Sequence, residues 1–85
     1  MGEIHDIAEK ALDLIYSDKR KEAIKLMVGF VGFKMESDKK RASKYLDARI
    51  TETIKIKGRV TKESLLFSIS GTESKKQLNK GKFKD

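Results

Sequence analysis

The sequence contains no cysteine, so neither disulfide bonds nor thiolate-bound metal ions can hold the fold together. A chain of 85 residues must then fold around one small apolar core. Hydrophobic residues make up 38% of the chain, which allows only a modest core. We therefore expect a single small domain, with part of its apolar surface covered by self-association.

Apolar residues recur at helical spacing through the first half of the chain. In residues 4–16 they share one face while acidic residues occupy the other, which predicts an amphipathic helix. Ser17 or Asp18 is then expected to cap a second helix. A similar cap near Asp38 is expected to begin a third helix, which extends to about residue 51.

The segment of residues 26–33 is continuously apolar and fits either a helix or a buried strand. Gly29 and Gly32 each disfavour a helix by about 1 kcal/mol relative to alanine. A helix is nevertheless favoured, because residues 19–26 begin as one and nothing before Gly29 ends it. The two glycines would then permit close approach of a neighbouring element.

After residue 51 the apolar spacing changes to two. Ile54 and Ile56 alternate with polar residues, and the same alternation recurs over residues 65–70. This pattern predicts two strands that form a hairpin. The expected fold is α+β, with three helices followed by a C-terminal β-hairpin, which is the element order of a winged helix. Residues 1–71 would form the domain, and the lysine-rich residues 72–85 a disordered basic tail.

The charge of the chain is strongly asymmetric. Residues 1–36 have a net charge of −1, whereas residues 37–85 have a net charge of +8. A basic half of this kind is typical of proteins that bind a polyanion. We expect a non-catalytic nucleic-acid-binding protein, with duplex DNA favoured and regulation of transcription or of a mobile element as its context. The expected contacts come from the third helix and the hairpin: Lys39, Lys40, Arg41, Lys44, Lys55, Lys57, Arg59 and Lys62.

Single-stranded nucleic acid is a weaker expectation, because it requires aromatic rings exposed on a basic surface. Tyr45 and Phe83 lie among lysines in the sequence, whereas Phe67 would face inward on the predicted hairpin. Tyr45 is expected to pack its ring against the core.

The alternative hypothesis is a small homo-oligomeric protein, viral or encoded by a mobile element, that inhibits or regulates a host protein. Its basic half would contact an acidic protein surface. The apolar segment would supply the seam of a homodimer, through Met27, Phe30, Val31 and Phe33.

Enzymatic activity has little support in the sequence. His5 is the sole histidine, and its pairing with Glu9 at helical spacing is best explained as a surface ion pair. No phosphate-binding glycine loop is present. We expect no cofactor and no bound metal.

A cytoplasmic location is expected from the N-terminus. Glu3, Asp6 and Glu9 interrupt the region where a signal peptide would be basic and then apolar. The longest uncharged apolar run, residues 26–33, is too short to span a bilayer.

Overall fold

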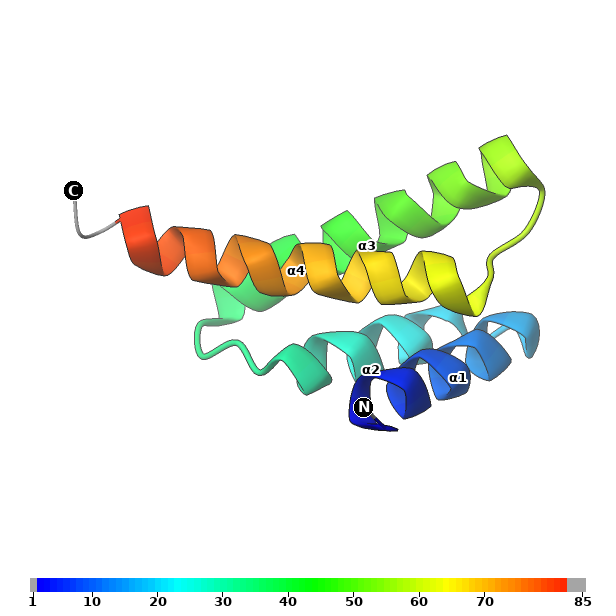
Figure 1. Cartoon of the computed structure of the whole chain (residues 1–85), viewed down its shortest axis with the longest axis horizontal. Coiled ribbons are helices and arrows are strands. Elements are labelled where there is room, and N and C mark those ends of the chain that lie inside the picture. The colour runs from blue at the N-terminus through cyan, green and yellow to red at the C-terminus, as the bar shows by residue number, and fades with distance from the viewer. Residues whose placement is uncertain (1, 83–85) are drawn as a thin grey trace.

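The computed structural model describes the backbone of residues 2–82 and the side chains of residues 3–73. The described residues form these helices, joined by short loops: α1 (Gly2–Tyr16), α2 (Arg20–Val31), α3 (Glu36–Lys57) and α4 (Lys62–Lys82). The first two helices pack as an antiparallel pair, and α4 contacts α1, α2 and α3 (Figure 1). Toward the end of α3 the ribbons of α3 and α4 spread apart. No helix in the described part of the chain is both long and apolar enough to cross a membrane.

The turn between α1 and α2 is closed by backbone hydrogen bonds around Asp18. The Lys19 N–H donates to the Leu14 carbonyl over 2.8 Å, and the Asp18 N–H donates to the Ile15 carbonyl over 3.2 Å. This pair of bonds is a Schellman motif, and Asp18 adopts the left-handed conformation that the motif requires, with φ 64°. Asp18 therefore ends α1 rather than capping α2, whose N-cap is Lys19 without a side-chain bond.

The favoured helix over residues 26–33 is confirmed as far as Val31, where α2 ends. Gly32 is its C-cap in the left-handed conformation, with φ 76°. The expected close approach at Gly29 is wrong, because a Cβ placed there would meet nothing within 4 Å. The cap predicted near Asp38 is also shifted, since α3 begins at Glu36 and its N-cap is Met35.

The predicted β-hairpin is wrong, because residues 2–82 contain no strand and the fold is all-α. Residues 53–57 complete α3, and residues 65–70 lie inside α4. The α+β class and the winged-helix order are corrected together, since without a hairpin there is no wing. Phe67, which the alternation placed on the inner face of a strand, is 74% exposed.

Buried hydroxyl residues conceal the helical period of α4. Its buried positions are spaced three and four residues apart, but two of them are Ser68 and Thr72 rather than apolar residues. Ser68 Oγ donates to the Ser64 carbonyl, and Thr72 Oγ1 donates to the Ser68 carbonyl, each over 2.9 Å. Because these bonds satisfy the hydroxyl groups within the helix, both side chains can be buried at little cost.

The backbone of α4 continues to Lys82, through residues that the sequence analysis assigned to the basic tail. The division between a domain of residues 1–71 and a tail of residues 72–85 stays a prediction. Phe83 lies outside the described residues.

The loop between α3 and α4 is held at both ends. Gly58 ends α3 in the left-handed conformation, with φ 85°. Val60 is buried, and its carbonyl accepts a hydrogen bond of 2.6 Å from the hydroxyl of Tyr16 at the end of α1. Thr61 and Ser64 then exchange reciprocal bonds between side chain and backbone N–H, which is a capping-box arrangement at the start of α4.

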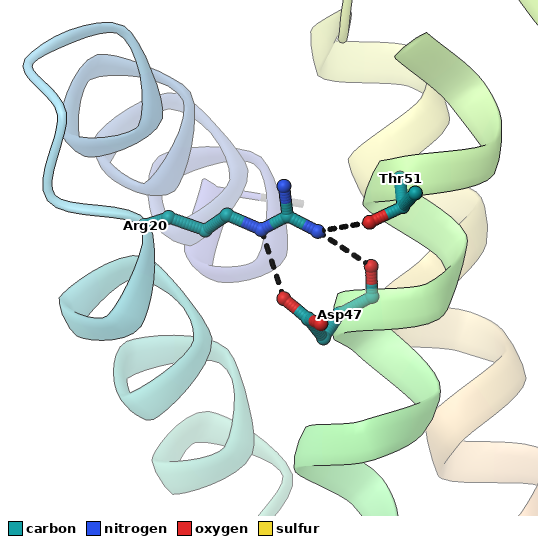
Figure 2. A network of polar contacts seen from close by, with 3 residues as sticks. All are labelled: Arg20, Asp47 and Thr51. Atoms are coloured by element: carbon teal, nitrogen blue, oxygen red, sulfur yellow. Dashed lines mark hydrogen bonds and ion pairs between the residues drawn. The ribbon is translucent and has the colours of Figure 1, made fainter. Parts of the chain in front are cut away.

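Arg20 joins α2 to α3 through a polar network (Figure 2). Its Nε donates to Asp47 Oδ1 over 2.9 Å, and its Nη2 donates to the Asp47 carbonyl over 2.8 Å and to the Thr51 hydroxyl. A guanidinium group can make all three bonds at once because its donors lie in one plane. The first residue of α2 is thereby fixed to the middle of α3.

The core is formed by all four helices. Met27, Leu46, Leu65 and Ile69 are among its fully buried side chains. Every buried side-chain nitrogen and oxygen among residues 3–73 has a hydrogen-bond partner. The last buried residue of α3 is Ile50, so the final two turns of that helix extend past the core.

Candidate nucleic-acid interface

The solvent face of α3 carries four of the predicted contact residues: Lys40, Arg41, Lys44 and Lys55. All are exposed, and they lie opposite Ala42, Leu46 and Ile50, which face the core. At about 1.5 Å of rise per residue, the row from Lys40 to Lys55 extends over about 22 Å. We call these four residues the α3 cation row.

Lys40, Lys44 and Lys55 form no ion pair with another described residue. Arg41 Nη1 lies 4.0 Å from Asp38 Oδ1, and both groups reach solvent. An exposed ion pair contributes at most about 1 kcal/mol, so it opposes phosphate binding only weakly. The row therefore presents positive charge that a polyanion can neutralise.

The other predicted contact residues lie apart from the row. Lys39 pairs with Glu36 over 3.4 Å at the edge of α3, and Lys62 pairs with Glu9 of α1 over 3.8 Å. Lys57 and Arg59 are exposed at the end of α3 and in the loop that follows. The predicted set is thus divided between the row, the first turn of α3, the end of α3 with the loop after it, and the contact of α4 with α1.

A shallow groove lies between the end of α3 and the start of α4, with a volume of about 180 Å³. Two large apolar side chains in it are mostly exposed, Ile56 at 71% and Phe67 at 74%. It is lined by Arg49, Glu52, Thr53, Ile56, Lys57, Ser64 and Phe67. We call it the Ile56–Phe67 groove.

The polar groups of the groove differ in how they are engaged. Thr53 Oγ1 donates to the Arg49 carbonyl over 2.7 Å, and Ser64 Oγ donates to the Thr61 carbonyl over 2.8 Å. The cations Arg49 and Lys57 form no ion pair with a described residue, and Glu52 is the one acid among the lining residues. The groove is therefore cationic with an apolar centre.

Sequence analysis missed this groove because it treated residues 65–70 as a strand. In a helix, a core face at Leu65, Ser68 and Ile69 leaves position 67 on the opposite side. A helical interpretation of that segment would have shown Phe67 as an exposed ring.

The predicted dimer residues contribute to the core of a single chain. Met27 and Val31 are buried, and Phe30 and Phe33 are partly buried against the core. A homodimer seam at these positions stays a prediction.

The described residues offer few groups that could bind a metal ion. His5 is exposed on α1, and no cluster of three or more histidines and carboxylates suited to a metal ion occurs among these residues.

Comparisons of the chain with protein-family models, with curated protein sequences and with solved structures found no match.

Proposed function

We propose that this protein binds nucleic acid without catalysis, through phosphate contacts along the α3 cation row. The observation that carries the proposal is the row itself: four cations on one exposed helix face, with Lys40, Lys44 and Lys55 free of ion pairs to described residues. Cations in such a row release condensed counterions when they neutralise phosphates, so the affinity falls steeply with salt. Lys57 and Arg59 would add phosphate contacts beyond the end of α3.

The proposal needs neither a wing nor a specific base contact. Arg41 alone in the row has the planar fork that suits a guanine edge, so most contacts are to the backbone and carry little sequence preference. A cytoplasmic location and a regulatory role on nucleic acid belong to the same proposal.

The test is a fluorescence-anisotropy titration with random duplex DNA, single-stranded DNA and duplex RNA, at about 50 and 200 mM salt. The variant reverses three charges of the row, Lys40→Glu, Lys44→Glu and Lys55→Glu. We expect at least a tenfold loss of affinity and a log–log salt dependence shallower by about two to three.

A matched control changes three exposed lysines of the acidic half by the same charge, Lys10→Glu, Lys21→Glu and Lys25→Glu. If both triple variants lose affinity equally, net charge rather than the row governs binding, and the row is not the interface. Absence of binding to all three nucleic acids at low salt would overturn the proposal and put the alternative, a protein partner with an acidic surface, first.

A further inference from the structure

We propose that the Ile56–Phe67 groove holds an unpaired base of single-stranded nucleic acid, stacked on the ring of Phe67. This inference rests on the proposed function and names its substrate class. Neighbouring phosphates would contact Arg49 and Lys57.

The exposed apolar centre of the groove is the first observation. Phe67 and Ile56 are each more than two-thirds exposed, although they are large apolar side chains on well-formed helices. Leaving them in water forgoes the stabilisation that burial of their apolar surface would provide. A ligand that covers both side chains recovers that stabilisation.

The charge around the groove restricts the ligand. Arg49 and Lys57 outnumber Glu52 among the lining residues, and the exposed Arg59 follows directly after α3. A second copy that placed the same groove against this one across a two-fold axis would bring the same excess of positive charge and be repelled. The ligand must therefore combine negative charge with a flat or apolar group.

Single-stranded nucleic acid meets both conditions in every nucleotide. Stacking platforms on such proteins pair an aromatic ring with a cationic surface that follows the backbone. Bases inside a duplex are already stacked on their neighbours, so their faces cannot reach Phe67 without extrusion. The groove lies on the side of α3 that faces α4, whereas the cation row lies on the opposite, solvent side, so the phosphates beside a base in the groove would contact Arg49 and Lys57 rather than the row.

The chain has no tryptophan, so Phe67→Trp creates a single fluorescent reporter within the groove. Titration with an oligothymidine should quench its emission, whereas a backbone of equal length with abasic sites should not. His5→Trp, on the exposed face of α1, is the control that should show no quenching.

Affinity supplies the second measurement. Phe67→Ala should weaken binding to the oligothymidine roughly tenfold and leave binding to the abasic strand unchanged, because only stacking is removed. Because Phe67 is mostly exposed, this change leaves the core intact. Glu52→Gln should strengthen binding to both strands, since it removes the one acid that faces the phosphates.

The outcomes separate this inference from the proposed function. If the Lys40, Lys44 and Lys55 variant loses binding while Phe67→Ala does not, the stacking site is wrong and the cation row stands. Equal affinity of the wild type for duplex and single strands would also overturn the stacking site. If the wild type binds no nucleic acid, both proposals fail, and an acidic protein becomes the partner to test at the groove.

Discussion

Among the described side chains, Arg20 makes the largest set of hydrogen bonds between two helices. Its three bonds reach Asp47 and Thr51, across a junction that is partly open to solvent, with 34% of the Arg20 side chain exposed. At such a site the charge attraction is screened, and the hydrogen-bond geometry provides most of the stabilisation.

Arg20→Lys keeps the charge but loses the fork that bonds Asp47 and Thr51 together. We expect the free energy of unfolding to fall by about 1 kcal/mol, the net contribution of a typical hydrogen bond, because the site is partly open to solvent. Urea unfolding followed by circular dichroism measures the change. It should persist at high salt, where a loss of charge attraction alone would disappear.

Lys21→Ala is the control for Arg20→Lys, because Lys21 is the exposed next residue and makes no described contact. Its effect should stay within about 0.5 kcal/mol. If the Arg20→Lys variant were as stable as the wild type, the ion pair alone would account for the contact, and the hydrogen bonds of the guanidinium group would add no stability.

At the scale of elements, α3 and α4 pack closely where Gly71 meets Tyr45. A Cβ added at Gly71 would collide with the Tyr45 hydroxyl and lie 3.2 Å from Tyr45 Cζ. Glycine in a helix is disfavoured by about 1 kcal/mol relative to alanine, so its place inside α4 has a packing reason.

Gly71→Ala should therefore lower the free energy of unfolding despite the better helix propensity of alanine. In a Tyr45→Phe background the same change should be at least about 1 kcal/mol less damaging, because the colliding oxygen is gone. A double-mutant cycle by urea unfolding gives this coupling.

Gly29→Ala is the matched control for Gly71→Ala, since Gly29 also lies inside a helix but its Cβ would meet nothing within 4 Å. It should stabilise the protein by up to about 1 kcal/mol. Additive effects of the Gly71 and Tyr45 changes would show that the two helices adjust freely at this contact.

The same elements show which parts of the fold the sequence can predict. The helix over residues 4–16 and the helical nature of residues 26–31 follow from apolar residues at positions that are buried or partly buried against the core. The prediction fails at Ile54 and Ile56, because these residues lie past the core and their spacing does not reflect burial. It fails again in α4, where Ser68 and Thr72 occupy core positions.

The candidate interface also has a part that the sequence can predict and a part that it cannot. Lys40, Arg41 and Lys44 lie in the segment predicted as a helix, whereas Lys55 lies in the segment predicted as a strand and joins the row only because α3 continues to Lys57. The Ile56–Phe67 groove depends on two segments that were both assigned to strands. Its discovery requires the packing of α3 against α4, which no local pattern contains.

In the whole molecule, the acidic and the basic halves of the sequence lie on different pairs of helices. The helices α1 and α2 lie within the neutral-to-acidic residues 1–36, whereas α4 and all of α3 except its first residue, Glu36, belong to the basic half. Within the described residues, ion pairs from Arg20 to Asp47 and from Lys62 to Glu9 connect the two pairs. A polyanion bound to α3 would therefore leave the acidic face of α1 directed to solvent.

Single-stranded DNA should raise the midpoint of thermal unfolding, because it binds the folded state. At a concentration of about 100 times Kd the stabilisation is about 2.7 kcal/mol, or roughly 10 °C or more for a domain of this size. Circular dichroism at 222 nm measures the shift, and the same spectra test the all-α fold through their paired helical minima.

The thermal shift should shrink as salt is added and vanish in the Lys40, Lys44 and Lys55 variant. An equal shift in that variant would place the bound strand elsewhere on the molecule. A spectrum with a single β-type minimum would contradict the all-α fold.

The bond from the Tyr16 hydroxyl to the Val60 carbonyl affects a surface that Tyr16 does not line. The two walls of the groove meet at the loop of residues 58–61, and that loop is fastened by this bond and by the buried Val60. A groove whose walls are fixed beforehand loses little entropy when it is filled, which slows release of the ligand. How long a ligand stays bound would then depend on a tyrosine of the first helix that never touches it.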